Sequence, residues 1–304
     1  MSRIHSFAEL HHRLSALPRR ARIAICWPSD EHSLHAVLTA VEAGWAEALL
    51  VGQCHEATLQ ALAPEHRQWV EQIVAPDAET AIQQAVQLVH DGQADVLMKG
   101  MVNTDNLLRH ILNKEYGLRP AGAVISHIAV YETPPIDRLL IISDVAVIPE
   151  PTLEQREAQI GYTTQIARSL GIDHPRAALL HFTEKVNEKF PLTLDYVTLK
   201  ERCAAGQYGA LTLDGPLDLL CAIHPEALEA KGLQSPLEGK ADILLMPNIQ
   251  AGNILYKALE FFPVRSDSAS LLAGTSAPVV LTSRGDTTQA KVNSLALAAL
   301  QMKH

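Results

Sequence analysis

The sequence has few aromatic residues and few cysteines, no long apolar run and no basic stripe. Aromatic residues make up 5% of the 304 residues, and no pair of cysteines has Cys-x-x-Cys spacing. A secreted disulfide framework or a zinc site is therefore not expected. We interpret the cysteines as buried small hydrophobes in a reducing compartment. They are Cys26, Cys54, Cys203 and Cys221.

The charge balance and the apolar runs exclude further classes. No stretch approaches 18 uncharged apolar residues, so no membrane span is predicted, and segment 1–14 lacks the apolar core of a signal peptide. We therefore expect a cytoplasmic protein. The chain carries 25 Lys and Arg against 34 Asp and Glu, a formal net charge of −9. This balance argues against nucleic acid as a partner, but a few local cations can still bind a polyanionic small molecule.

Several catalytic and metal-binding motifs are also missing. No G-x-G-x-x-G follows a predicted strand, no P-loop is present, and no G-x-S-x-G elbow surrounds a serine. His32 and His35 have H-x-x-H spacing, but no third ligand accompanies them, so we expect exposed helix positions. The sequence therefore predicts no metal site.

Short apolar runs alternate with helical patterns from about residue 20 onward. The run 23–26 predicts a buried strand, Ser29 or Asp30 is placed to cap a helix ending near Gly44, and the run 48–51 predicts the next strand. This order is a βαβ unit, which implies a parallel sheet. The apolar positions of the helix recur at i, i+3, i+4 and i+7: Leu34, Val37, Leu38 and Val41.

The same alternation continues to the end of the chain. A hydrophobic content of 47% is enough for a globular core, and the pattern is typical of a doubly wound α/β architecture. Asp77 is placed to cap a helix that ends at Gly92. Further buried strands are expected at 95–98, 177–180, 210–213, 243–246 and 279–282.

One region breaks this rhythm. Segments 122–131 and 138–143 are both strand-like, and the turn-rich segment 132–137 separates them. This arrangement predicts an antiparallel excursion at the start of a second domain.

Polar residues directly follow several of the predicted strands. Ligands of parallel sheets bind beyond the carboxyl ends of the strands, where helix N-termini favour phosphate groups. At the last of these ends, Ser283 offers a hydroxyl donor, Arg284 a permanent charge, and Gly285 room for close approach. The alternative is an ordinary strand–turn–helix junction, in which Asp286 caps the last helix.

Other strand and helix ends offer weaker candidates. Lys99 follows a strand, but it also fits a solvated lysine. Lys114 and Arg119 complement the dipole of a helix that Gly117 is placed to end. Asn248 either contributes to a site or caps a helix.

Taken together, these segments resemble the phosphate acetyltransferase and butyryltransferase family. The resemblance covers essentially the whole chain. The length of the chain and the signature 282–284 are closer to the butyryl branch than to the acetyl branch. The segments that carry it are Lys99-Gly100, Asn113-Lys114-Glu115, Gly117-Leu118-Arg119, Ser126-His127, Ala241 to Asn248, Ala251-Gly252-Asn253, Tyr256-Lys257 and Gly274 to Arg284.

The resemblance implies a reversible reaction in which acyl-CoA and phosphate give acyl phosphate and CoA. The CoA thiolate attacks the acyl phosphate directly in a ternary complex, with CoA as a substrate and no tightly bound cofactor. The implied fold is a two-domain parallel-sheet fold like that of the isocitrate and isopropylmalate dehydrogenases, with the active site in the interdomain cleft. The expected domains are 1–122 with 270–304, and 123–269. A homodimer or larger assembly is also implied.

The resemblance also implies roles for individual residues. Ser283 is expected to stabilise the tetrahedral oxyanion and Arg284 to hold phosphate. The acetyl branch has an aspartate seven residues after the serine, where this chain has Ala290, so the base for the thiol is open. The candidate bases are Asp286, Asp144 and His127, and of these we count Asp286 with the catalytic residues. Alternatively, positive charge from Arg284 and Lys99 lowers the pKa of the thiol without a dedicated base. The expected substrate-binding residues are Lys99, Thr104, Asn113, Lys114, Arg119, Ser126, His127, Asn248, Asn253 and Lys257.

Two other functions stay open from the sequence. One is a metal- and NAD-dependent dehydrogenase on the same fold, which needs a cluster of aspartates that we do not find. The other is a non-catalytic protein that binds CoA or an acyl phosphate, an alternative that the loss of an acidic residue at position 290 keeps open. Turnover of butyryl-CoA with phosphate, and dependence on metal and NAD, separate the three.

Overall fold

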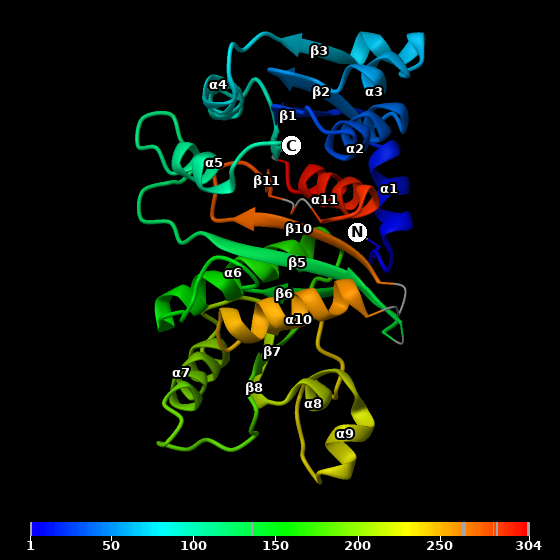
Figure 1. Cartoon of the computed structure of the whole chain (residues 1–304). Coiled ribbons are helices and arrows are strands. Elements are labelled where there is room, and N and C mark those ends of the chain that lie inside the picture. Colours follow the sequence, from blue (N-terminus) through cyan, green and yellow to red (C-terminus); the bar gives the residue numbers. More distant parts are fainter. Residues whose placement is uncertain (1, 135, 263–265, 282, 284, 303–304) are drawn as a thin grey trace. The chain divides into compact units, whose positions relative to one another are not determined.

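A computed structural model of the chain describes residues 2–134, 136–262, 266–281, 283 and 285–302. The chain forms two compact units (Figure 1). Unit 1 comprises Met1–Ser6 and Ser126–Ser266, and unit 2 comprises Phe7–Ile125 and Asp267–His304. The domain limits expected from the sequence stay a prediction.

Unit 2 is built on a mostly parallel sheet. Its strand order is β3-β2-β1-β4-β11-β10, and β10 is antiparallel to β11 while the other neighbours are parallel. The first βαβ unit of the sequence reading is confirmed, because β1 and β2 pair in parallel from Ala21↔Ala46 to Cys26↔Val51. The strands are β1 (Ala21–Cys26), β2 (Ala46–Val51), β3 (Val70–Ile73), β4 (Val96–Lys99), β10 (Asp267–Ala273) and β11 (Val279–Val280).

The helices of unit 2 begin and end where local chemistry places them. Asp30 and Asp77 cap α2 and α4 through their carboxylates, as expected. Gly44 has φ +86°, a left-handed conformation that suits glycine after a helix end. The last helix, α11, packs against α1, α2 and β10. The helices are α1 (Phe7–Ser15), α2 (Glu31–Glu42), α3 (Glu56–Gln60), η1 (Pro64–Trp69), α4 (Ala78–His90), α5 (Thr104–Ile111) and α11 (Thr288–Leu300).

Unit 1 contains the antiparallel excursion predicted from the sequence. Its strand order is β5-β6-β9-β7-β8, in which β5 and β6 pair antiparallel and the others pair in parallel. The strands are β5 (Ser126–Glu132), β6 (Leu140–Ser143), β7 (Arg176–Leu180), β8 (Thr212–Leu217) and β9 (Ile243–Leu245).

Helices α8, α9 and α10 of unit 1 contribute to a hydrophobic core that they share with its strands. Thr152 and Gln155 form a reciprocal capping box at the start of α6. Tyr131 of β5, Ile142 of β6, Leu244 of β9 and Tyr256 of α10 are buried in this core. The helices are α6 (Leu153–Ser169), α7 (Leu192–Ala204), α8 (Leu219–Ile223), α9 (Pro225–Ala230) and α10 (Ile249–Phe261).

The α/β architecture expected from the sequence is confirmed, although β3, β10 and α1 were not anticipated. Segment 267–273 was missed because its two serines interrupt the apolar pattern, yet both are buried. The backbone N–H of Ser270 donates to the Ser294 hydroxyl on α11, at 2.9 Å. In the described part of the chain, no helix has both the length and the apolar character needed to cross a membrane.

Candidate active site

Lys99 ends strand β4 in a buried position, and only 5% of its surface is exposed. The solvated lysine that the sequence left as an alternative is therefore wrong. The Lys99 ammonium donates to the carbonyl of Gly100 at 3.3 Å. A Cβ at Gly100 would collide with the carbonyl oxygens of Cys26 and Trp27, so glycine is needed for the chain to turn beside β1. A buried cation at a strand's carboxyl end is a suitable anion-binding group.

The turn at Ser283 is organised by Asp286. One carboxylate oxygen of Asp286 accepts a hydrogen bond from the backbone N–H of Ser283 at 2.7 Å, and the Ser283 hydroxyl accepts from the N–H of Gly285 at 3.4 Å. The helix-capping role considered for Asp286 is wrong, because Thr287 caps α11 through a bond from the N–H of Ala290. Asp286 thus fixes the segment from which the Ser283 hydroxyl projects.

Lys291 is a fourth polar residue of this region, and the sequence analysis did not predict it. Its side chain on α11 is buried, with 3% exposure. The ammonium donates to the backbone carbonyls of Asp286 at 2.8 Å and Ser283 at 3.3 Å. Within the described part of the chain, no carboxylate lies within ion-pair distance of it. Its positive charge is therefore left to act on whatever occupies the neighbouring space.

Lys99, Ser283 and Lys291 line one cavity of about 90 Å³ in unit 2. Asp30, His32, Ser33, Gly100 and Met101 form the rest of the wall. The His32 ring contacts the Thr288 hydroxyl at 3.1 Å. This volume is below the roughly 300–1,000 Å³ of pockets that enclose whole drug-sized ligands. Two ammonium groups and a hydroxyl in so small a space suit a small oxyanion such as phosphate. His32 and His35 are exposed, as predicted.

Arg284 and its neighbour Thr282 lie outside the described residues. The expectation that Arg284 holds phosphate is therefore untested. Asp286, two positions further on, is described and half-buried.

Four other expected binding residues of unit 2 lie on α5 and the segment after it. Thr104 is the first residue of α5, and the Asn113 side chain accepts from the N–H of Glu115 at 2.8 Å, which closes a turn. Lys114 and Arg119 are exposed. Their contact with substrate stays a prediction.

Gly117 was expected from the sequence to end the helix, and this prediction is wrong. Helix α5 stops at Ile111, six residues earlier. A Cβ at Gly117 would collide with the carbonyl oxygens of Asn113 and Ile111. The glycine is required by the compact turn that follows the helix.

In unit 1, Ser126 and His127 are joined to Asp144. One Asp144 oxygen accepts from the Ser126 hydroxyl at 2.8 Å and from the His127 N–H at 3.0 Å. The other accepts from the N–H groups of Ala146 and Val147, both at 2.7 Å. With four donors on a buried carboxylate, Asp144 is a structural anchor for β5 and the end of β6.

Helix α10 brings three more expected residues to this region. Asn248 caps the helix, since its side chain accepts from the N–H of Ala251 at 3.0 Å. The Asn253 amide donates to the carbonyl of Val145 at 2.9 Å. Lys257 lies 4.3 Å above the ring of Tyr256 and pairs with Glu260 at 2.9 Å. The capping alternative for Asn248 is thus confirmed.

His127 itself is buried, and neither ring nitrogen has a hydrogen-bond partner among the described residues. Its ring lies 6.4 Å from that of Tyr256. Burial lowers its pKa to about 4, although the Asp144 carboxylate opposes this shift. A neutral imidazole with two unsatisfied nitrogens inside a protein points to a missing ligand or water. In the sequence, His127 was selected as a candidate because the Ser126-His127 pair belongs to the segments that carry the family resemblance.

The predicted residues therefore fall into two groups. In unit 2, Lys99, Ser283 and Asp286 come together with Lys291. In unit 1, Ser126, His127, Asn253 and Lys257 gather around Asp144 and Tyr256.

The cysteines offer no nucleophile here. Burial raises the pKa of the Cys26 thiol to about 11, even though the Lys99 ammonium opposes the shift. The thiol therefore stays protonated at neutral pH, whereas attack requires the thiolate. This agrees with the expectation that the cysteines are buried, although Cys203 is partly exposed.

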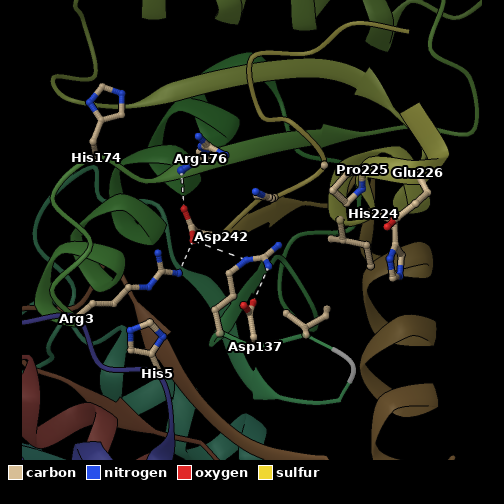
Figure 2. Close-up of a pocket in the computed structure, with 14 residues that line it drawn as sticks. Arg3, His5, Asp137, His174, Arg176, His224, Pro225, Glu226 and Asp242 are labelled. Carbon is tan, nitrogen blue, oxygen red and sulfur yellow. Dashed lines mark hydrogen bonds and ion pairs between the residues drawn. The ribbon is translucent and has the colours of Figure 1, made fainter. Parts of the chain in front are cut away.

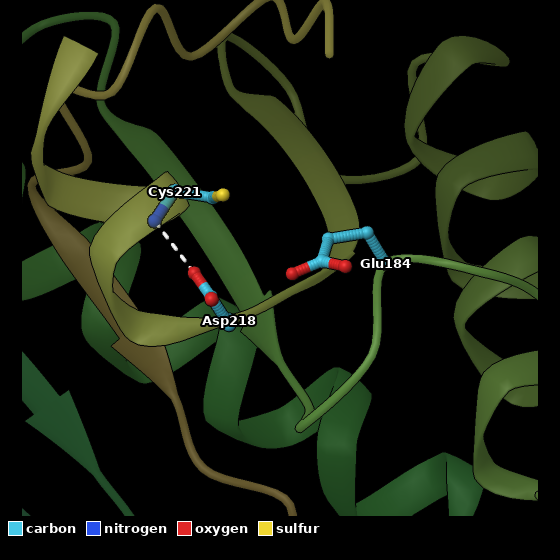
Figure 3. A group of neighbouring side chains, drawn as sticks. All are labelled: Glu184, Asp218 and Cys221. Atoms are coloured by element: carbon cyan, nitrogen blue, oxygen red, sulfur yellow. Dashed lines mark hydrogen bonds between the residues drawn. The ribbon is translucent and has the colours of Figure 1, made fainter. Parts of the chain in front are cut away.

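Glu184, Asp218 and Cys221 are close enough together to be considered as metal ligands (Figure 3). The Lys231 ammonium already lies between the two carboxylates, 2.7 Å from Glu184 and 2.6 Å from Asp218. Burial and the Asp218 carboxylate raise the pKa of Cys221 to about 11. An ammonium ion and a protonated thiol make this cluster an ion-pair network.

The comparison with known proteins agrees with the resemblance seen in the sequence. The family model described as phosphate acetyl/butaryl transferase matches residues 68–299. The phosphate butyryltransferase of Clostridium acetobutylicum is 42% identical over 98% of both chains. The phosphate acetyltransferase of Thermotoga maritima is 38% identical over 92% of this chain and 94% of its own.

Solved structures extend the likeness to the fold. A branched-chain phosphotransacylase from Enterococcus faecalis superposes with a TM-score of 0.79 and 30% identity, over 93% of this chain and all of its own. A 4-hydroxythreonine-4-phosphate dehydrogenase from Klebsiella pneumoniae, at 14% identity and a TM-score of 0.54, shares the fold alone. The chain belongs to the phosphate acetyl/butaryl transferase family.

Proposed function

We propose that this protein transfers a short-chain acyl group reversibly between CoA and inorganic phosphate. The observation that carries the proposal is the small cavity in unit 2, where two buried ammonium groups face Ser283. Family membership supports the same reaction, because a relative 42% identical over 98% of the chain is a phosphate butyryltransferase.

Lys99 and Lys291 hold the phosphate in this proposal. Ammonium groups are point-charge donors to phosphate oxygens, and their attraction is stronger where water is excluded. Arg284 adds a bidentate donor if it occupies the position that the family resemblance assigns to it. CoA enters as a substrate, and the proposed reaction requires no tightly bound cofactor.

The chemical step is a direct displacement. In the CoA-acylating direction, the thiolate sulfur attacks the carbonyl carbon of the acyl phosphate, and the carbonyl electron pair moves onto oxygen. The Ser283 hydroxyl donates a hydrogen bond to this oxyanion. When the carbonyl re-forms, the bond to the phosphate oxygen breaks and phosphate leaves. The thiol releases its proton to water, and the departing phosphate takes one up from water. In the other direction, a phosphate oxygen attacks the thioester and the CoA thiolate leaves.

The thiol has to lose its proton without the aspartate of the acetyl branch, because position 290 is alanine. Asp286 is engaged with the N–H of Ser283, and Asp144 accepts four hydrogen bonds. We therefore assign positioning roles to both carboxylates. A free thiol has a pKa near 8.5, and nearby positive charge lowers it. Lys99, Lys291 and Arg284 supply that charge in the proposed site.

We propose that the unit 1 group binds substrate, the role that the family resemblance implies for it. The two unsatisfied ring nitrogens of His127 are its strongest support. Ser126 and Asn253 position their neighbours rather than reach the substrate, because their side chains bond Asp144 and Val145. We further propose a cytoplasmic location and a homodimer or larger assembly.

Rates of CoA release test the proposal. Acetyl-, propionyl-, butyryl- and longer acyl-CoA are each assayed with and without phosphate. We expect phosphate-dependent release with one or more short chains, and the ranking gives the chain length. Lys99→Gln should lower the rate, while the matched Lys189→Gln, at an exposed position of unit 1, should not. A rate of CoA release that is the same with and without phosphate for every acyl-CoA contradicts the proposal.

A further inference from the structure

A second, larger pocket lies in unit 1 (Figure 2). Its volume is about 610 Å³, within the roughly 300–1,000 Å³ of pockets that bind small molecules. Half of its fourteen lining residues are basic, in a chain whose formal net charge is −9. None of the residues that we place in acyl transfer lines it.

The pocket is at the amino ends of three parallel strands. Arg138 lies two residues before β6, Arg176 is the first residue of β7, and Asp242 directly precedes β9. The strands pair in parallel with Ile243 opposite both Ile141 and Ala177, so these residues share one edge of the sheet. Asn248 follows the opposite end of β9, so the pocket and the unit 1 group occupy opposite edges of that sheet.

Asp242 fixes the arginines that face the pocket. Its buried carboxylate accepts from Arg3 at 2.7 Å and from the backbone N–H of Arg176 at 2.9 Å, and Arg138 lies 3.9 Å away (Figure 2). The Arg3 side chain is placed by the N-terminal segment, because the N–H of Ile4 donates to the carbonyl of Leu170 at 2.8 Å. The carboxylate thereby orients the Arg3 guanidinium and holds the backbone from which Arg176 projects.

The arginines keep donor capacity beyond these bonds. A guanidinium has five N–H donors, and Arg3 uses one of them on Asp242. Its Nε is buried and has no acceptor among the described residues. Arg176 bonds the carbonyl of Leu237 and the exposed Glu238 through one of its nitrogens, Nη1. Lys240 is exposed at the pocket wall.

The remaining lining supports the same ligand class. His174 and His224 line the cavity from two further elements (Figure 2) and add ring nitrogens that can donate. Two other acidic residues, Asp137 and Glu226, line the pocket. Asp137 is paired with Arg138 at 3.3 Å. Forked guanidinium donors around a metabolite-sized space favour a compact oxyanion with two or more charges.

We propose that this pocket binds a small phosphorylated metabolite, through Arg3, Arg176 and Lys240, independently of acyl transfer. The shared chemistry is a phosphate or pyrophosphate group on a small body. Binding to this pocket and binding to the phosphate cavity of unit 2 involve different side chains, so substitutions can separate them.

Calorimetric titration with inorganic pyrophosphate tests the proposal. The variants are Arg176→Gln with Lys240→Gln, and Lys240→Gln alone, because Lys240 is exposed and its loss leaves the Asp242 network intact. Lys185→Gln with Lys189→Gln is the control, with the same charge change at exposed positions of unit 1. Lys99→Gln reports on the phosphate cavity.

We expect the double pocket variant to lose about tenfold or more in pyrophosphate affinity and the single variant to lose less. The control and Lys99→Gln should stay within about twofold of the wild type. Acyl transfer by the pocket variants should be unchanged, which also shows that they fold. No binding by the wild type, equal loss in the control, or loss confined to Lys99→Gln would overturn the proposal. None of these results bears on acyl transfer, which the CoA-release assay tests separately.

Discussion

The Asp286 carboxylate accepts a hydrogen bond from the backbone N–H of Ser283, three positions earlier, at 2.7 Å, and Ser283 lines the cavity of about 90 Å³ in unit 2. A carboxylate with this partner is suited to hold the serine in place. The same bond can be made by an amide oxygen, whereas a general base needs an ionisable group. The two roles therefore predict different responses to substitution.

Asp286→Asn should keep kcat within about tenfold of the wild type, because the asparagine oxygen still accepts from Ser283. Asp286→Ala should lose more, since the turn is then unsupported. The pH profile of kcat should be the same for Asp286→Asn and the wild type. If Asn and Ala are equally inactive, and the acidic limb of the profile is lost, Asp286 is the base.

Lys291→Gln should raise the KM for phosphate. Its ammonium faces a cavity and bonds two carbonyls, with no paired carboxylate among the described residues. Loss of one charge-assisted contact costs roughly 1.5–3 kcal/mol, which is about 10- to 100-fold in kcat/KM for phosphate. Initial rates at varied phosphate measure this, with Lys189→Gln as the control. A variant that only becomes less stable, with its KM for phosphate unchanged, would reduce Lys291 to a structural role.

His127 should make the fold sensitive to acid. Its pKa is lowered from 6.5 to about 4 by burial, so the unfolded chain binds the proton more readily. The free energy of unfolding should therefore fall as the pH drops from about 6.5 to 4, by at most roughly 3 kcal/mol. His127→Gln should show a smaller fall over that range in urea unfolding, and His35→Gln, at an exposed position, should match the wild type. Parallel curves for all three proteins would contradict the assignment.

Much of the framework could be predicted from the sequence because it depends on local patterns. An apolar run that forms a strand involves only a few consecutive residues. A carboxylate that caps a helix bonds an N–H only three residues later. Asp30 and Asp77 cap helices for that reason. The polar residues at the strand ends could be selected for the same reason, since the carboxyl edge of a parallel sheet is where ligands bind.

The errors arose where tertiary contacts decide. Every residue of α11 from Lys291 to Ala299 is buried, so the helix has no exposed face over this stretch. Periodicity in the sequence therefore cannot show that Lys291 is buried. Asp286 looked like a cap, but Thr287 is one residue closer to the helix and takes that role. Gly117 looked like a helix stop, although close backbone contacts in the following turn are what require it.

Ser283→Ala should lower kcat by roughly 10²–10³ and leave substrate binding nearly unchanged, because it removes one donor to the oxyanion. The intact mass of the wild-type protein after mixing with acyl-CoA alone should show no acyl adduct. In the described turn, the Ser283 hydroxyl accepts from the N–H of Gly285, which is no base. An adduct on Ser283 that forms as fast as turnover would instead indicate a covalent mechanism.

In the proposed reaction phosphate is the acyl acceptor, and ³¹P NMR of the reaction mixture follows its conversion. The protein is mixed with butyryl-CoA and inorganic phosphate, and the phosphate signal is followed while free thiol is titrated in the same samples. We expect an acyl phosphate resonance to grow as the phosphate signal declines, with one acyl phosphate formed for each CoA released. Release of CoA with no acyl phosphate, or no turnover of any short-chain acyl-CoA, would contradict it.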